Sequence, residues 1–219
     1  MSVISKFMGD WALEFSKLLD YADMIKSTNP EISCWVRIDN ETQPEKYLFK
    51  YFYVCFDSLN NGWLEGYRRI IGLDSCFLKG AYKGELLVAI EKNGNQQMYP
   101  IALAVIDQET KHSWSWFLSH LIQDLELGVG DGLIIMSDMQ KGLILAVQEL
   151  LPNAERRMCA RHIWANWQKN REMKQEEKLS GVVLRPVLSL KKDQEQQLKQ
   201  HQTVNILLNN LVQLLKQCQ

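Results

Sequence analysis

Two stretches of sequence decide the fold: Ile70-Ile71-Gly72-Leu73-Asp74-Ser75-Cys76-Phe77-Leu78-Lys79-Gly80 and, later, Ile134-Ile135-Met136-Ser137-Asp138. Each is an apolar run typical of a buried β-strand, and each carries an aspartate toward its end. Carboxylates held by two strands of one sheet are suitable ligands for a divalent-metal phosphoryl-transfer site. We therefore predict such a site at Asp74 and Asp138. The alternative is that each aspartate only ends its strand and caps the next turn.

The residues around the first stretch predict a three-stranded meander. The strands are expected at 69–77, 85–91 and 98–106, joined by short glycine-containing connectors at 79–84 and 92–95. Connectors this short allow antiparallel pairing and exclude a helical crossover between these strands.

After the meander the apolar side chains recur with helical spacing. They predict an amphipathic helix and are Trp114, Phe117, Leu118, Leu121, Ile122 and Leu125. A strand at 133–136, a helix at 142–151, a strand at 154–158 and a helix from about 161 are expected next. This order predicts an α/β, RNase H-like fold. Its mixed sheet consists of an antiparallel meander followed by helix-strand-helix-strand, with helices on both faces.

Upstream of the meander, residues 1–28 have the apolar spacing of a helix. Two short extended runs follow at 32–38 and 47–57, with a polar hairpin or loop between them. The sequence Asn60-Asn61-Gly62 predicts a turn that leads into the first strand of the meander.

Composition divides the chain into three segments. Residues 1–60 are an N-terminal helix and hairpin segment, residues 61–172 the α/β core, and residues 173–219 a helical tail rich in Lys, Glu and Gln. Apolar side chains of the tail alternate in spacing between four and three residues, as in a coiled coil, at Val204, Leu208, Leu211, Leu215 and Cys218. We expect this C-terminal helix either to form a homo-oligomer or to fray.

Composition also excludes several classes of protein. Of 219 residues, 46% are hydrophobic and 23% charged, which suffices for one well-packed core. The formal net charge of −1 is not that of a strongly basic nucleic-acid binder, so DNA contacts must come from a local patch. The five cysteines are odd in number and widely spaced, which indicates reduced thiols in an intracellular protein. Without an export signal or a long apolar run, neither secretion nor membrane insertion is expected.

Basic side chains in two places could contact a DNA backbone. The candidates are Lys79, Lys83, Arg156, Arg157 and Arg161. The first two flank a glycine turn near Asp74, and the others belong to a basic segment at 155–178. A solvated helix face explains the charges of that segment equally well.

Other polar and aromatic residues give weaker signals. Cys159 and His162 have zinc-ligand chemistry, but a structural zinc needs four ligands and no second pair follows nearby, so packing is the commoner explanation. Trp116 lies off the apolar helix face and is a candidate for base stacking. His112 and His120 are expected to be solvated. No glycine-rich nucleotide loop or Ser-His-Asp arrangement is present, so no small-molecule substrate is expected.

Five motifs, in this order and spacing, resemble a known family. They are Gly72-Leu-Asp74-Ser-Cys-Phe-Leu-Lys-Gly80, Tyr99-Pro-Ile-Ala102, Ser113-Trp-Ser-Trp-Phe117, Ser137-Asp138-Met-Gln-Lys-Gly-Leu143 and Cys159-Ala-Arg-His162-Ile-Trp-Ala-Asn166. Together they resemble the catalytic domain of plant Mutator-like element (MULE, MuDR-type) transposases, over about residues 20–170.

The resemblance implies a nuclear DDE-type transposase core that cuts and joins double-stranded DNA with two Mg²⁺ or Mn²⁺ ions. Asp74 matches the first catalytic aspartate, Asp138 the second, and Cys159 and His162 the family's Cys/His element. The family's third carboxylate lies on a helix beyond that element, where the similarity has ended. The acidic residues present there are Glu172, Glu176 and Glu177. No motif selects one of them.

Three functional hypotheses follow. The first is a transposase-derived domain for metal-dependent DNA cleavage and strand transfer, truncated and inactive as it stands. The second is a domesticated, non-catalytic nuclear protein that uses the fold to bind DNA or a partner. The third is a metal-dependent nuclease that uses one of the late glutamates. The sequence leaves open whether the chain is an enzyme.

Overall fold

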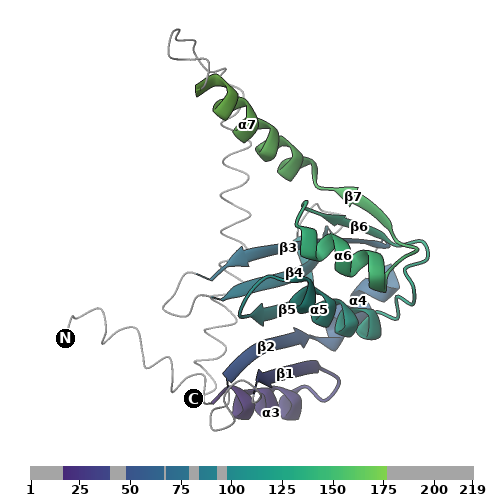
Figure 1. Ribbon diagram of the computed structural model, residues 1–219. Helices are drawn as coiled ribbons and strands as arrows, with labels where there is room; N and C mark the ends of the chain where they lie inside the picture. The colour runs from purple at the N-terminus through teal and green to yellow at the C-terminus, as the bar shows by residue number, and fades with distance from the viewer. Residues whose placement is uncertain (1–16, 40–47, 67, 79–83, 93–97, 177–219) are drawn as a thin grey trace, which may run out of the picture. The chain divides into compact units, whose positions relative to one another are not determined.

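The chain divides into two compact units between Asn166 and Trp167. The computed structural model describes residues 17–39, 48–66, 68–78, 84–92 and 98–176. The first unit holds a mixed α/β sheet with its helices (Figure 1). Of the second unit, only the end of one helix, up to Glu176, is described.

Seven strands and five helices make up the described residues. The strands are β1 (Ser33–Asp39), β2 (Leu48–Cys55), β3 (Ile70–Phe77), β4 (Glu85–Lys92), β5 (Met98–Ile106), β6 (Ile134–Ser137) and β7 (Glu155–Met158). The helices are α3 (Leu18–Thr28), α4 (Asp57–Gly66), α5 (Lys111–Asp124), α6 (Lys141–Leu150) and α7 (Ala160–Glu176).

The strands form one sheet in the order β1-β2-β5-β4-β3-β6-β7. Along the run β1-β2-β5-β4-β3, each strand pairs antiparallel with the next. In contrast, β6 lies parallel to β3, and β7 lies parallel to β6. The expected meander is thus confirmed as β3, β4 and β5, followed by helix, strand, helix and strand. Because β3 and β6 run the same way, the chain must cross over between them, and α5 lies within that crossover.

One face of the sheet carries the larger hydrophobic core. The apolar stripe that predicted a helix at 114–125 packs there, with Trp114, Phe117 and Leu121 all fully buried. Leu143 and Val147 of α6 and Trp63 of α4 belong to the same core. Burying large side chains such as these stabilises the fold by about 1.5–3 kcal/mol each.

The opposite face carries a smaller core beneath α3. Ala22 and Ile25 of this helix are buried with Phe52 and Val54 of β2. The two cores lie on opposite sides of the sheet because neighbouring residues of a strand point to opposite faces, as Phe52 and Tyr53 do. Helices therefore cover both faces, as the sequence predicted.

The start of α5 and the start of α6 approach closely. Thr110 is the N-cap of α5 and forms a capping box with Ser113, whose side chain is fully buried. A Cβ atom at Gly142 would lie 2.6 Å from the backbone nitrogen of Lys111, so this contact requires glycine. The approach brings the segment before α5 close to the segment that follows β6.

The expected turn at Asn60-Asn61-Gly62 is wrong, because these residues lie inside α4. Helical spacing lets the Asn61 side-chain amide donate to Asp57 Oδ2 at 2.7 Å. Trp63 is buried in the main core. Tertiary burial thus overrides a local turn signal.

Other expectations fall outside the described residues in whole or in part. The N-terminal helix is seen as α3 from Leu18, and the two extended runs as the antiparallel β1–β2 pair. The loop between that pair, the two connectors of the meander except their ends, and the tail beyond 176 are not described. Within the described residues, no helix is long and apolar enough to cross a membrane.

Candidate functional site

Asp74 and Asp138 lie at matching positions on neighbouring parallel strands. Gly72 of β3 pairs with Met136 of β6, and each aspartate lies two residues further along its strand or just beyond it. Because side chains alternate along a strand, a step of two keeps both aspartates on the same face of the sheet. The structure therefore places the two aspartates at one level of the sheet, Asp74 within β3 and Asp138 just after the end of β6.

The Asp74 carboxylate has a partner at each oxygen. Its Oδ1 accepts from the backbone N–H of Ser75 at 2.9 Å, and its Oδ2 accepts from Arg161 Nη2 at 2.8 Å. About one third of each side chain in this ion pair is exposed. Asp74 is thus oriented by the backbone, neutralised by a guanidinium and still reached by solvent.

The Asp138 carboxylate takes part in the turn that starts α6. Its Oδ1 accepts from the backbone N–H of Gln140 at 3.0 Å, and the Gln140 side chain in turn caps the helix by accepting from Leu143 N at 2.6 Å. Asp138 therefore does cap a turn, as the structural alternative proposed. The same bond orients its carboxylate, so capping the turn is compatible with a role as a ligand.

The Cys/His element lies next to the two aspartates. The backbone N–H of Cys159 donates to the carbonyl of Ser137 at 2.7 Å, which fixes the start of α7 to the end of β6. Arg161 then reaches Asp74 and also lies 3.3 Å from His162 Nε2. His162 Nδ1 is buried and has no hydrogen-bond partner in the described part of the chain. This segment therefore joins the site through Arg161.

Glu109, which the sequence analysis missed, lies near the same end of the sheet. Its Oε1 accepts from Trp114 Nε1 at 2.9 Å. Burial raises the pKa of Glu109; hydrogen bonds from Trp114 and Ser75 oppose that rise, and the negative charges of Glu85 and Asp138 add to it. An acidic residue just before a helix N-cap was the available signal. Alone it does not distinguish a site residue from a surface charge.

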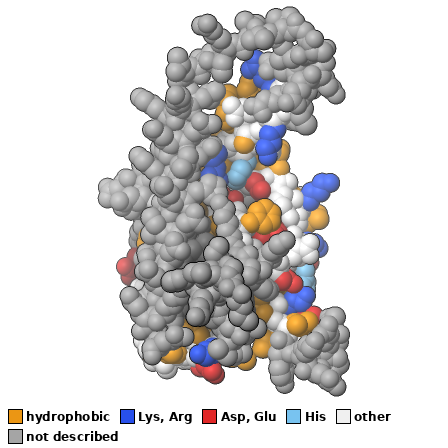
Figure 2. Space-filling view, turned by 90° about the vertical axis from the view of Figure 1, so that its left-hand side faces the viewer, with side chains coloured by type: hydrophobic (Ala, Val, Ile, Leu, Met, Phe, Trp, Pro, Cys, Tyr) orange, Lys and Arg blue, Asp and Glu red, His pale blue; other side chains and the backbone are white. Residues whose placement is uncertain are grey.

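Two carboxylates, Asp74 of β3 and Glu85 of β4, act on the thiol of Cys76. Burial raises the pKa of the Cys76 thiol, and the charges of Asp74 and Glu85 raise it further. On the face shown in Figure 2, acidic side chains lie beside basic ones and a histidine, with hydrophobic side chains around them.

The remaining predicted residues are distributed as follows. Arg156 and Arg157 are exposed on the edge strand β7, where Arg157 Nε donates to Glu155 Oε1 at 2.8 Å. Lys79, Lys83 and Glu177 lie outside the described residues, and the side chains of Glu172 and Glu176 are not described.

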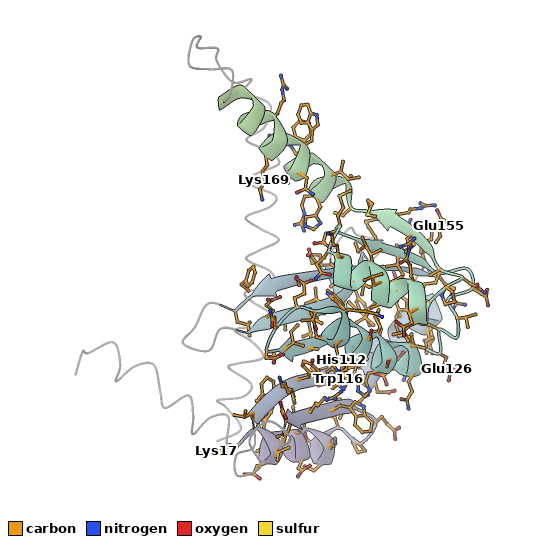
Figure 3. The ribbon with its side chains drawn as sticks, viewed as in Figure 1. Lys17, His112, Trp116, Glu126, Glu155 and Lys169 are labelled. Atoms are coloured by element: carbon orange, nitrogen blue, oxygen red, sulfur yellow. The ribbon has the colours of Figure 1, made fainter. Side chains whose placement is uncertain are left out.

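The aromatic residues of α5 pack within the fold. Trp114 and Phe117 are core residues, as expected. Trp116 contacts Tyr51 at a ring separation of 5.0 Å, so packing accounts for this residue (Figure 3). His112 is exposed as expected. His120 is not solvated as expected, because its ring stacks on Trp35 at 5.2 Å.

The donor chemistry of the two aspartates fits a hard divalent cation. Two carboxylates on adjacent strands offer the oxygen ligands that Mg²⁺ and Mn²⁺ prefer. Among the described residues, no three His, Cys, Asp or Glu side chains are grouped so that they could hold a metal ion. Asp74 and Asp138 would therefore hold a cation together with solvent or with groups outside this set. The predicted zinc at Cys159 and His162 stays a prediction.

Fold and site together define a class: a mixed α/β domain with one aspartate within a strand and a second just after the adjacent parallel strand. Residues 70–166 match the family model described as MULE transposase domain. The match runs from β3 into α7 and includes both aspartates and the Cys/His element. The chain is thus similar to the MULE transposase domain over residues 70–166, in agreement with the resemblance of its motifs.

A curated relative is the Protein FAR-RED IMPAIRED RESPONSE 1 of Arabidopsis thaliana. It is 26% identical to this chain over 150 residues, which are 68% of this chain. The aligned region is 16% of that protein's length, so this chain spans a small part of the relative.

Proposed function

We propose that this chain is a DDE-type transposase-derived domain of RNase H-like fold that cleaves and joins double-stranded DNA with a divalent metal. The observation that carries the proposal is the position of Asp74 and Asp138, each two residues beyond the paired Gly72 and Met136, inside the segment that matches the MULE transposase domain. A nuclear location is part of this proposal, because it is where the double-stranded DNA substrate would be met.

The residues of the chain take distinct roles in this proposal. Asp74 and Asp138 would hold Mg²⁺ or Mn²⁺, which supplies an activated water or 3′-hydroxyl and stabilises the leaving oxygen. The Ser75 N–H orients the first carboxylate, and the Gln140 N–H orients the second. Such preorganisation matters because phosphoryl transfer depends on placement to within about half an ångström.

The basic side chains of the domain would contact DNA. Arg156 and Arg157 extend from the exposed strand β7, which follows directly in the sheet after the strand that leads to Asp138. Arginine binds phosphate through two parallel hydrogen bonds, so it suits this position. Lys79 and Lys83, near Asp74 in sequence, remain predicted phosphate contacts.

The test is Mn²⁺-dependent nicking of supercoiled plasmid DNA. The assay compares the chain with its Asp138→Asn variant and with Asp131→Asn, a matched control in an exposed position at which an asparagine oxygen can still accept from Asn153. We expect Asp138→Asn to lose nicking by about 100-fold or more, as misplaced reacting groups do, and Asp131→Asn to keep it. Equal nicking by all three proteins would contradict the proposal. No nicking by the unmodified chain would contradict the proposed cleavage and would agree with the prediction that the chain is inactive.

A second function is favoured by one observation, the ion pair of Asp74 with Arg161. A carboxylate already balanced by a guanidinium can serve a non-catalytic domain that binds DNA or a partner. In that case the folded chain would bind DNA without nicking it. The double variant Asp74→Asn, Asp138→Asn would then keep the DNA affinity, as measured by fluorescence anisotropy in 0.1 M salt.

A further inference from the structure

Arg161 occupies one of the two oxygens through which Asp74 would bind a cation. Its Nη2 lies 2.8 Å from Asp74 Oδ2, and Oδ1 is already used by the Ser75 N–H. A guanidinium and a divalent cation cannot both hold the same oxygen along the same direction. Each carboxylate oxygen has two lone pairs, so a cation that approaches Oδ2 from the side of Arg161 must open this ion pair. A cation that approaches from another side still meets the positive charge of the guanidinium.

The position of Arg161 is set by the backbone around it. The N–H of Cys159 donates to Ser137 O at 2.7 Å, and the N–H of Ile163 donates to Cys159 O at 3.0 Å in the first turn of α7. Ser137 directly precedes Asp138. The same short segment thus fixes Asp138 on one side and directs Arg161 to Asp74 on the other.

The positive charge of Arg161 reduces the electrostatic repulsion between the two carboxylates. Two carboxylates at one level of neighbouring strands repel each other unless a positive charge lies between or beside them. Arg161 supplies one such charge from within the chain, and a divalent cation would supply a larger one. The two cations therefore compete for Asp74.

We propose that Arg161 is a positioning residue that holds Asp74 in the metal-free chain, is displaced from it by the divalent cation, and so sets the metal affinity of the site. The inference rests on the proposed function, because it assumes that a cation binds at Asp74. Once displaced, the guanidinium lies beside the metal site as a ligand for a DNA phosphate.

The first test is Mn²⁺ binding by isothermal titration calorimetry, with the full chain, its Arg161→Gln variant and Arg157→Gln. The last variant is a matched control, since it removes the same charge from the adjacent strand without touching Asp74. We expect Arg161→Gln to bind Mn²⁺ about five-fold more tightly, as removal of a partly exposed ion pair permits. Arg157→Gln should bind like the unmodified chain, and adding Asp74→Asn to Arg161→Gln should abolish the gain.

The outcomes separate the two proposals. Mn²⁺ binding that depends on Asp74 but is no tighter in Arg161→Gln overturns the role of Arg161 and leaves the proposed function standing. Binding that appears only in Arg161→Gln supports that role. If neither protein binds Mn²⁺ at Asp74, both proposals fail.

A second measurement covers the case in which Arg161→Gln does not fold. The NMR signal of the Arg161 Nε–H group is followed in the unmodified chain while Mg²⁺ is added. We expect the signal to shift over the same Mg²⁺ concentrations that saturate the site. An unchanged signal at saturating Mg²⁺ would overturn the displacement.

Discussion

Strands β2 and β7 belong to one sheet but differ in how deeply their residues are buried. Five successive residues of β2, from Tyr51 to Cys55, are buried, because α3 covers one face and α5 the other. All four residues of β7 are exposed, and three of them are charged. The sheet is therefore a scaffold on the β2 side and an accessible surface on the β7 side. Asp138 directly follows β6, which lies between β3 and β7, and Asp74 lies on β3.

The largest test of this comparison is Phe117→Ala. Phe117 is fully buried in the core beside the β2 side, where its ring packs against Trp114 and Tyr53. We expect the free energy of unfolding to fall by about 3–5 kcal/mol, through lost burial and the cavity left behind. Urea unfolding followed by circular dichroism measures the change.

The matched substitution on the other side is Met158→Ala in β7. Because this side chain is exposed, we expect the free energy of unfolding to change by less than about 0.5 kcal/mol. Comparable losses in the two variants would show that the β7 side is as much a part of the core as the β2 side.

A smaller effect concerns pH and His120. Its ring lies among Trp35, Tyr53 and Trp116, and burial lowers its pKa, opposed by the charge of Asp124. In the unfolded chain the pKa returns to about 6.5, so the unfolded state binds more protons near this pH. The contribution of neutral His120 to the free energy of unfolding is therefore fully present above about pH 6.5. It is lost as the pH falls through the folded-state pKa of this residue.

The measurement is the denaturation midpoint of the chain and of His120→Gln between pH 5 and pH 8. We expect the unmodified chain to lose more stability on acidification than the variant, since the other histidines contribute equally to both. Parallel pH profiles would mean that His120 is as solvated as its sequence suggested.

The smallest effect is expected for Glu155→Gln in β7. The Glu155–Arg157 ion pair lies on the surface, where exposed pairs contribute little to stability. The thermal midpoint should not change within experimental error. A clear decrease would indicate that β7 is stabilised by its charges rather than by its pairing with β6.

The elements with strong periodicity were predicted well from the sequence. The meander strands and α5 were located to within a few residues because their apolar patterns repeat several times. The α4 helix was missed, because its burial through Trp63 depends on distant parts of the chain. The same reason explains His120, whose partners Trp35 and Tyr53 come from strands far away in sequence.

The candidate site was predictable only in part. Aspartates within or just after apolar runs can be recognised in a sequence, and the structure places Asp74 on β3 and Asp138 just after the adjacent β6. The pairing of Asp74 with Arg161 joins residues that are 87 positions apart, and no local pattern encodes it. Glu109 reaches the site only because the starts of α5 and α6 are in contact at Gly142.

The parallel pairing of β3 with β6 also has a consequence for folding kinetics. The antiparallel strands β3, β4 and β5 are close in sequence and can pair soon after synthesis, whereas β6 must wait until α5 has closed a long crossover. Non-local pairings of this kind form slowly because the entropy of loop closure is lost first. We therefore expect the two aspartates to come together late, after most of the chain has already collapsed.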